Sequence, residues 1–306
     1  MRRTLVMTLV LLVFLAIDLK AQRPYYSNEK YYESAVVFEV GGTVGMMNAL
    51  TDIGGRKGIG KRFIKDLNSK NFKPSFGFYV LANVMHMLGA RIEANFGSVR
   101  AYDSILKNVR NTTFGRYERN LSFRSKITDF QLSLEVHPLM FKQYDDEEPP
   151  YWSPYILAGV GYFSFNPEAN LNGQWYALQP LRTEGQGFKE YPNRKPYSLS
   201  QINFPVGFGV RYEVSSVLYS RLELVYRILT TDYLDDVSTD YIDPALFPNY
   251  LSANQAAIAT QLFDRQAELD PGHDTVIGGQ RGDPKDNDAF FSIQLKLGFV
   301  IGRQKR

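Results

Sequence analysis

One stretch near the C-terminal end alternates between two kinds of side chain: Phe291-Ser292-Ile293-Gln294-Leu295-Lys296-Leu297-Gly298-Phe299-Val300-Ile301. Successive side chains of a β-strand point to opposite faces, so a period of two separates this stretch into an apolar face and a mostly polar face. A strand crosses a bilayer in about 9–11 residues when it is tilted, and this stretch is long enough to do so. It predicts a strand with one face toward lipid.

The same alternation recurs upstream. The alternating segments lie at 36–43, 75–80, 90–97, 129–136, 203–213 and 218–228. Segment 155–165 is apolar on both faces, and we expect Gly159 and Gly161 to make room in the interior. The second face carries Arg, Glu, Asp and Gly in strand after strand, whereas a soluble lipocalin-like barrel, the structural alternative, needs an apolar interior. The sequence predicts an all-β, transmembrane, up-and-down antiparallel β-barrel of about eight strands.

The connections between these segments alternate in length. Short ones lie near 83–87, 138–153 and 215–216, and long ones at 48–73, 101–125, 166–199 and 231–288. Outer-membrane barrels have short periplasmic turns and long extracellular loops, so we expect both termini to be periplasmic. Within the last loop, 253–269 is expected to form a helix that Pro271-Gly272 ends. Whether 48–73 folds outside the barrel or plugs its lumen stays open.

The N-terminal residues predict export. Met1-Arg2-Arg3 precedes an apolar run from Leu5 to Ile17, and Ala21 offers a small residue for cleavage, as in a signal peptide. An uncleaved anchor is the alternative, but the run is shorter than the roughly 20 residues of a spanning helix. We expect a signal peptide at 1–21, an N-terminal periplasmic segment at 22–34 and an outer-membrane barrel at 35–306.

Composition excludes several classes of site. The chain has no Cys, which removes disulfides, thiolate metal sites, cysteine nucleophiles and a lipid-modified N-terminal Cys. A net charge of +3 over 306 residues gives no indication of nucleic-acid binding. The 21 Phe, 20 Tyr and 24 Gly residues fit strands with one lipid face and one polar face.

The inward faces of the predicted strands carry both signs of charge. The interior of an eight-stranded barrel is just wide enough for side chains to fill it. Charged groups survive in such an interior when they are paired and hydrogen-bonded, so we expect an ion-pair network that fills the lumen. A gated conduit is the functional alternative. The expected network residues are Glu39, Arg91, Glu93, Asp129, Glu135, Arg211, Glu213, Arg221, Glu223, Arg227 and Lys296.

Two motifs resemble ligand sites but depart from their patterns. Gly55–Lys61 matches the start of a phosphate-binding loop, yet Arg62 stands where Ser or Thr would hold magnesium. Asp283, Asp286 and Asp288 offer oxygen ligands for calcium but lack the Gly and the terminal Glu of an EF-hand. We therefore expect no cofactor and no metal, while calcium binding by the acidic loop 283–288 stays open.

The histidines give no indication of a catalytic group. We expect His86 and His137 at periplasmic turns and His273 in a distant outer loop, so the three do not converge. No G-x-S-x-G nucleophile elbow is present. We expect no catalytic residues, and an outer-membrane enzyme built from the loops remains an alternative.

Four segments together resemble a known family. They are Glu135-Val136-His137-Pro138, 154–161, 204–212 and 231–238, and the signal peptide ends in Ala21-Gln22, as in exported Bacteroidetes proteins. With these segments the chain resembles a Bacteroidetes family of outer-membrane β-barrels that includes the PorG component of the type IX secretion and gliding-motility machinery. The resemblance spans most of the mature chain, and its most particular part is Tyr233-Leu234-Asp235-Asp236-Val237-Ser238.

The resemblance implies a non-enzymatic barrel, surrounded by outer-membrane lipid, that anchors a periplasmic ring made of a lipoprotein and its partner. The turn from Lys142 to Tyr151 is long and acidic, and we hypothesise that it docks the ring; a solvated turn without a partner is the alternative. An OmpA-like or OmpX-like surface barrel, acting in adhesion or envelope integrity through its long loops, is the alternative function. The docking residues would be Gln143, Tyr144, Asp145, Asp146, Glu147 and Glu148.

Overall fold

The computed structural model describes residues 31–56, 68–113, 115–142, 150–215 and 217–305. The predicted signal peptide, the predicted cleavage site, most of the phosphate-loop motif and the predicted docking residues 143–148 lie outside the described residues. Among the described residues, no helix combines the length and the apolar character needed to cross a membrane.

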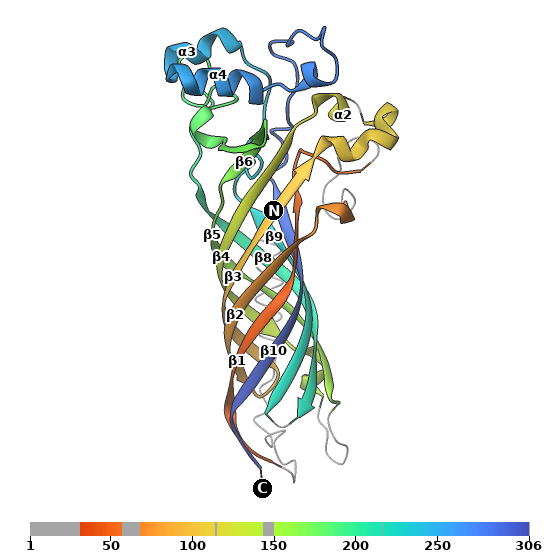
Figure 1. Cartoon of the computed structure of the whole chain (residues 1–306). Coiled ribbons are helices and arrows are strands. Elements are labelled where there is room, and N and C mark those ends of the chain that lie inside the picture. Colours follow the sequence, from red (N-terminus) through yellow and green to blue (C-terminus); the bar gives the residue numbers. More distant parts are fainter. Residues whose placement is uncertain (1–30, 57–67, 114, 143–149, 216, 306) are drawn as a thin grey trace, which may run out of the picture.

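Eight long antiparallel strands close into a barrel (Figure 1). Around the wall the order is β3-β2-β1-β10-β9-β8-β5-β4, and pairing of β3 with β4 closes it. The prediction of an up-and-down eight-stranded β-barrel is confirmed. The strands are β1 (Tyr31–Leu50), β2 (Lys73–Val84), β3 (Leu88–Tyr102), β4 (Ser122–Val136), β5 (Trp152–Ser164), β8 (Ser200–Ser215), β9 (Leu218–Leu229) and β10 (Ala289–Lys305).

The first strand starts earlier than the sequence indicates. The predicted barrel begins at Ala35, but β1 begins at Tyr31, inside the segment assigned to the periplasm. The reason is its partner, because β10 continues to Lys305 and pairs with Tyr31, with a register shift between Glu33 and Phe38. The start of β1 and the end of β10 therefore run together beyond the rest of the wall.

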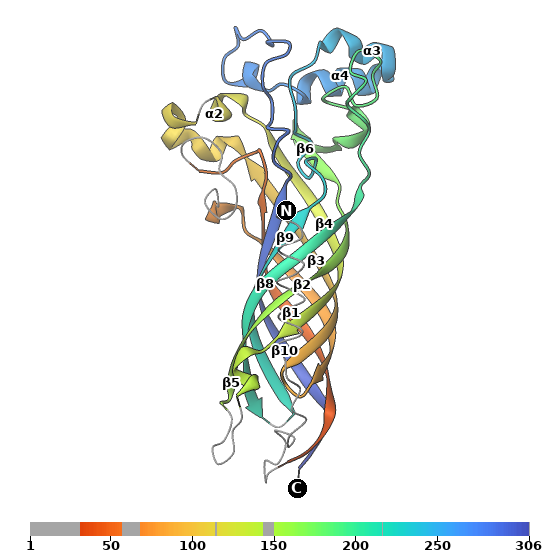
Figure 2. The same cartoon turned by 180° about the vertical axis from the view of Figure 1, so that it is seen from behind.

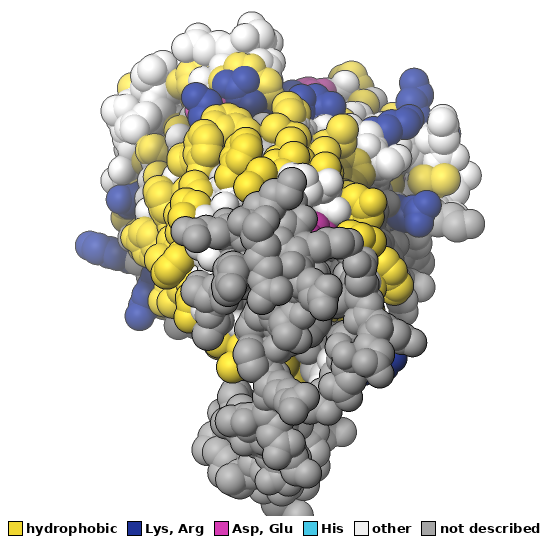
Figure 3. Space-filling view, turned by 90° about the horizontal axis from the view of Figure 1, so that it is seen from below, with side chains coloured by type: hydrophobic (Ala, Val, Ile, Leu, Met, Phe, Trp, Pro, Cys, Tyr) yellow, Lys and Arg dark blue, Asp and Glu magenta, His cyan; other side chains and the backbone are white. Residues whose placement is uncertain are grey.

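The outer wall is apolar, and the inner face is not. On β10, Ile293, Leu295 and Leu297 are each at least 40% exposed, whereas Gln294 and Lys296 between them are fully buried. Figure 3, seen from the end that carries the C-terminus, shows hydrophobic side chains gathered over this wall. Aliphatic side chains face outward on every barrel strand, which is favourable in lipid and unfavourable in water.

The glycines of β5 serve close approach rather than flexibility. A Cβ at Gly161 would meet the side chain of Asn203 at 2.6 Å, so this glycine makes room in the interior, as the sequence predicts. At Gly159 a Cβ would instead meet the backbone of Leu132 and Ser133 on β4. Gly159 therefore allows two strands to lie close together.

The connections separate by length onto the two ends of the barrel (Figures 1 and 2). The short β2–β3, β4–β5 and β8–β9 connections lie at the end with the C-terminus, and the long loops lie at the opposite end. One short connection contains the 3₁₀ helix Pro138–Phe141. The predicted alternation of short and long connections is confirmed.

The long loops form a structured cap. Its described residues form the hairpin of β6 (Pro167–Leu171) and β7 (Gln174–Ala177) and three α-helices, α2 (Arg116–Arg119), α3 (Phe247–Tyr250) and α4 (Ala253–Leu262). Its 3₁₀ helices are Ser69–Asn71, Asp103–Thr112, Gln179–Leu181, Pro244–Leu246 and Gln266–Glu268. The cap also has its own apolar core, where Phe188 stacks on Tyr250 with ring centroids 4.0 Å apart.

The predicted helix 253–269 is too long. A capping box between Ser252 and Gln255 starts α4, but the helix ends at Leu262. The carboxylate of Asp264 accepts a hydrogen bond from the backbone N–H of Gln266 at 3.0 Å. Such a local side-chain bond competes with helical hydrogen bonding, so the chain turns well before Pro271.

Candidate functional site

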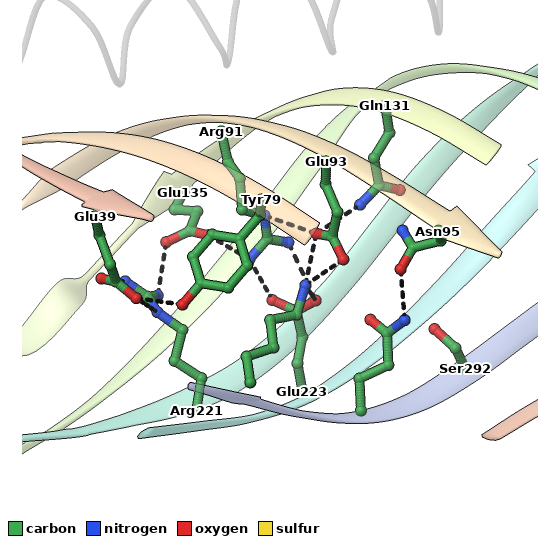
Figure 4. A network of polar contacts seen from close by, with 12 residues as sticks. Glu39, Tyr79, Arg91, Glu93, Asn95, Gln131, Glu135, Arg221, Glu223 and Ser292 are labelled. Atoms are coloured by element: carbon green, nitrogen blue, oxygen red, sulfur yellow. Dashed lines mark hydrogen bonds and ion pairs between the residues drawn. The ribbon is translucent and has the colours of Figure 1, made fainter. Parts of the chain in front are cut away.

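Charged side chains from five strands meet in the lumen (Figure 4). Arg221 on β9 binds Glu39 of β1 through two hydrogen bonds, Nη2 to Oε2 at 2.6 Å and Nε to Oε1 at 2.9 Å. Its Nη1 lies 3.1 Å from Oε2 of Glu135 on β4. One guanidinium thus joins two carboxylates from opposite parts of the wall, in the fork geometry that makes such pairs strong.

Arg91 and Lys296 extend this network. Nη1 of Arg91 lies 2.6 Å from Glu135 and 2.7 Å from Glu223, and its Nε lies 3.0 Å from Glu93. Nζ of Lys296 contacts Glu93 at 2.5 Å and Glu223 at 2.9 Å. All of these side chains are buried, so the network crosses the lumen as a layer of paired charges.

A second group lies nearer the cap. Nε of Arg227 lies 2.7 Å from Asp129, and its Nη1 donates to the hydroxyl of Ser292 at 2.9 Å. Asn203 donates to the other oxygen of Asp129 at 2.8 Å. Asp129 precedes Glu135 by six residues on β4, which places this group about 20 Å farther along the strand.

Arg211 and Glu213 lie apart from these two groups, toward the end with the short turns, although the sequence assigned both to the network. Arg211 is buried, with Nη1 3.5 Å from Nδ1 of His86 and its guanidinium carbon 4.9 Å from the ring centre of Tyr219. Glu213 is half-buried, two residues farther along β8. The other nine residues take part in the two groups described above.

Two tyrosines in the network were not assigned to it from the sequence. Tyr79 donates to Glu39 at 2.5 Å, and Tyr155 donates to Glu223 at 2.7 Å. Only charged residues were assigned to the network from the sequence, although Tyr79 falls on the polar face by its position and Tyr155 begins the segment that is apolar on both faces. Several amides also line this interior: Asn95, Gln131, Asn203 and Gln294.

Gly298 creates the space that Glu39 and Tyr79 occupy. A Cβ at this position would overlap with Oε1 of Glu39 and the hydroxyl of Tyr79. Replacing Gly298 with valine is therefore expected to displace both groups and to destabilise the barrel by about 1–3 kcal/mol, the usual cost of overpacking. Urea unfolding of the detergent-solubilised protein measures this, with Gly42→Val as the control because a Cβ at Gly42 would meet only the backbone oxygen of Gly77, at 3.9 Å. An unchanged urea midpoint for Gly298→Val would contradict this prediction, because it would mean that Glu39 and Tyr79 move aside without cost.

An apolar layer lies above the charged groups at the mouth of the barrel. It joins strand residues such as Val99, Phe123 and Phe163 to loop residues Leu234 and Val237. A ladder of rings runs through it, from Phe163 to Phe165, Tyr197 and Tyr233, with centroids 5.3, 6.1 and 4.7 Å apart. The segment 233–238, the most particular part of the family resemblance, thus packs into the mouth of the barrel.

The described part of 48–73 contributes to the same layer. Ile53 is buried in it, and its backbone N–H donates to Asp235 at 3.0 Å. Gly54 donates to Asp103, which in turn pairs with Arg119 at 2.8 Å. Residues 51–56 therefore close over the mouth.

The three histidines lie where the sequence indicated, two near the short turns and one in the cap. His137 contacts Ser153 through Nδ1 at 3.0 Å and Glu135 through Nε2 at 3.4 Å. These residue types resemble a hydrolase triad, but His137 is completely buried and Ser153 is 1% exposed. In such a triad Nε2 of the histidine faces the serine and Nδ1 binds the carboxylate, whereas here Ser153 lies against Nδ1. These contacts hold Glu135 in place at the short-turn end of the charged network.

Asp283 and Asp288 of the predicted acidic loop have different partners. Asp283 accepts from the backbone of Lys285, while Asp288 turns inward and accepts from the backbone N–H of Leu234 at 2.8 Å. Within the described ranges, no group of three or more His, Cys, Asp or Glu side chains is arranged to hold a metal ion.

Asp288 joins a buried acidic cluster beneath the cap, which also contains Asp52, Asp232, Asp235 and Asp236. Burial raises the pKa of Asp232 to about 9 and that of Asp235 to about 8, and the neighbouring carboxylates add to both shifts. Burial also raises the pKa of Asp288 well above its ordinary value. For Asp52 and Asp236 burial raises the pKa to about 6, against the opposing charges of Arg119 and Arg281 respectively.

These features together decide the class of protein. A closed barrel with an apolar exterior satisfies every strand hydrogen bond inside its own wall, as spanning a bilayer requires. The chain is an outer-membrane-type β-barrel. Its lumen is filled by side chains, as expected from the sequence.

No family model and no curated protein matches the chain. Solved structures similar to it include the outer membrane protein OprG from Pseudomonas aeruginosa, at 10% identity and a TM-score of 0.39, covering 88% of this chain and 97% of that one. A major outer membrane protein from Thermus thermophilus matches at 14% identity and a TM-score of 0.36, covering 88% and 100%. The attachment invasion locus protein Ail of Yersinia pestis matches at 9% and 0.35, also covering 88% and 100%. The assignment of this barrel rests on its own strand pairing.

Proposed function

We propose that this protein is a non-enzymatic outer-membrane barrel that anchors the periplasmic ring of a type IX secretion and gliding machinery. The observation that carries the proposal is the filled lumen, with its layer of paired charges beneath an apolar layer. Such a barrel is a rigid body in the membrane rather than a solute path. The surfaces left to bind partners are the cap and the end that carries the C-terminus.

The resemblance of 135–138, 154–161, 204–212 and 231–238 to the PorG-containing family supports the anchoring role. In this proposal the termini and the short turns face the periplasm, and the ring lipoprotein and its partner bind there. Residues 143–148 stay our prediction for the docking turn. Their flanks, Phe141 and Trp152, lie at the end with the short turns.

The test is a crosslinked pull-down of the tagged protein from outer membranes in mild detergent, with the bound proteins identified by mass spectrometry. We expect to recover a ring-forming lipoprotein and its periplasmic partner. Shortening 143–149 is expected to reduce that recovery at least about tenfold, which corresponds to a loss of roughly 1.4 kcal/mol of binding free energy. Recovery unchanged by this deletion would rule out the docking turn and leave the anchor proposal intact.

A matched deletion in the cap controls for general damage. Residues 272–279 form a mostly exposed cap segment whose removal is expected to leave ring recovery unchanged. Recovery of the barrel alone from the intact protein would contradict the anchor proposal. It would favour the second candidate, a surface barrel for adhesion or envelope integrity, which the compact core of the cap supports because a rigid cap presents a fixed surface.

A further inference from the structure

A group of cations lies on the outer wall where β3 and β4 approach the cap. Arg100 on β3 stands directly opposite Arg124 on β4, and Ser98 stands opposite Lys126. All three cations occupy the outward face, because the residues between them point inward and are buried. Like charges directly opposite each other across two strands destabilise a sheet. The wall therefore keeps a repulsive pair on its exterior that an external anion would relieve.

The local partners offset little of this charge. Nε of Arg124 pairs with Glu168 of β6 at 2.8 Å, and its guanidinium lies over the ring of Trp175 at 3.7 Å. Arg100 donates to the backbone oxygen of Lys70 at 3.3 Å and also repels the ammonium group of Lys73. Among the described residues around this pair, Lys73, Arg100, Arg124 and Lys126 carry four positive charges against the one negative charge of Glu168. Three positive charges therefore remain unbalanced within this group.

The depth of the cluster in the membrane follows from the same two strands. Phe96 on β3 and Phe130 on β4 contact each other with ring centroids 6.3 Å apart, and Phe76 of β2 stacks on Phe96 at 5.5 Å. Tyr162 on β5 stands directly opposite Phe130 and is 57% exposed. Exposed Tyr and Trp rings mark the boundary between hydrocarbon and headgroups. Arg100 and Lys126 each lie four residues beyond a ring toward the cap, about 13 Å along the strand. That distance places them at headgroup level.

We propose that Arg100, Arg124 and Lys126 form a binding site for the phosphate of a membrane lipid in the leaflet around the cap end. Guanidinium and ammonium groups at headgroup level bind lipid phosphates, and the acyl chains would lie along the exposed apolar wall below, over Phe130, Leu132 and Leu134. The site depends on the barrel spanning a membrane but not on a secretion role. Lipid binding without ring recovery would contradict the anchor proposal alone.

The tryptophan beside Arg124 provides the readout. The chain has two tryptophans, and Trp152 lies at the opposite end, so Trp152→Phe leaves Trp175 as the sole reporter. The purified barrel with this change is titrated in non-ionic detergent with phosphorylated lipid A, with the same lipid after removal of its phosphates, and with inorganic phosphate. We expect Trp175 fluorescence to change with phosphorylated lipid A at concentrations at which neither of the other two has an effect.

Charge substitutions give expected changes of opposite sign. Arg100→Gln with Lys126→Gln is expected to weaken lipid A binding at least about tenfold, while Glu168→Gln is expected to tighten it. Lys107→Gln with Lys195→Gln, two exposed cations of the cap loops, should leave the affinity unchanged. Gel mobility of unheated samples checks that each variant is folded. The proposal would be overturned if Trp175 responded equally to lipid A with and without its phosphates, or equally to lipid A and inorganic phosphate. An unchanged lipid A affinity in the Arg100→Gln, Lys126→Gln variant would overturn it as well.

Discussion

Replacing Arg221 with leucine is expected to destabilise the barrel by about 3–5 kcal/mol, because removing one partner of a buried ion pair leaves the other charges without compensation. Both Glu39 and Glu135 lose their contact with this guanidinium, and both are buried. The free energy of unfolding in urea, followed by tryptophan fluorescence in detergent, measures the loss.

The control for this prediction is Lys107→Leu, which removes an exposed cation of the cap and should cost little. A sharper comparison adds Glu39→Gln and Glu135→Gln to Arg221→Leu. Once the carboxylates are neutral, the buried charge left by the single variant disappears, so the triple variant should recover much of the lost stability. A single variant as stable as the original protein would show that the lumen network contributes nothing.

The cap is expected to loosen as the pH rises from about 5.5 to about 8.5, because its acidic cluster binds protons more tightly when folded than when opened. The ordinary pKa of these aspartates is 3.8, whereas burial raises that of Asp52 to about 6 and that of Asp235 to about 8. At a pH between the ordinary pKa and the raised pKa of such an aspartate, the folded cap binds more protons than the opened cap. Stability is therefore greatest on the acid side and decreases as the pH rises through the window.

Hydrogen exchange of peptides covering 231–242, corrected for the intrinsic effect of pH, measures this opening. Each unit of raised pKa corresponds to a tenfold change in the opening equilibrium, so protection should fall at least about tenfold across the window. Asp232→Asn keeps the shape of the side chain but cannot ionise, and it should reduce the pH dependence and increase protection at pH 8.5. Asp274→Asn, in an exposed part of the cap, should change neither. Protection that rises with pH would contradict the assignment.

The wall of the barrel could be predicted because one local rule governs it. A period of two assigns each strand residue to lipid or lumen without knowledge of its partners, and this placed Arg91, Glu223 and Lys296 on the inner face. Tyr79 and Tyr155 were missed because only charged side chains were expected in the network, whereas a tyrosine hydroxyl can also donate to a buried carboxylate.

The cap could not be predicted in the same way. Its core depends on contacts between distant segments, such as Glu184 with Arg281, which are 97 residues apart. Glu184 also accepts from the backbone N–H groups of Ser238 and Thr239. No periodicity signals such pairs. Nor does a local pattern indicate that Asp235 and Asp236 are completely buried.

The extended pairing of β1 with β10 determines when the barrel can form. Tyr31 pairs with Lys305, so the wall closes through strands that are far apart in the sequence. β10 is also the partner of β9, and without it two strand edges would lie open in a bilayer that offers no hydrogen-bonding partner. Neither seam can form until β10 is in place, so one strand decides both. Completion of the wall is therefore a single event that joins the first barrel strand to the last.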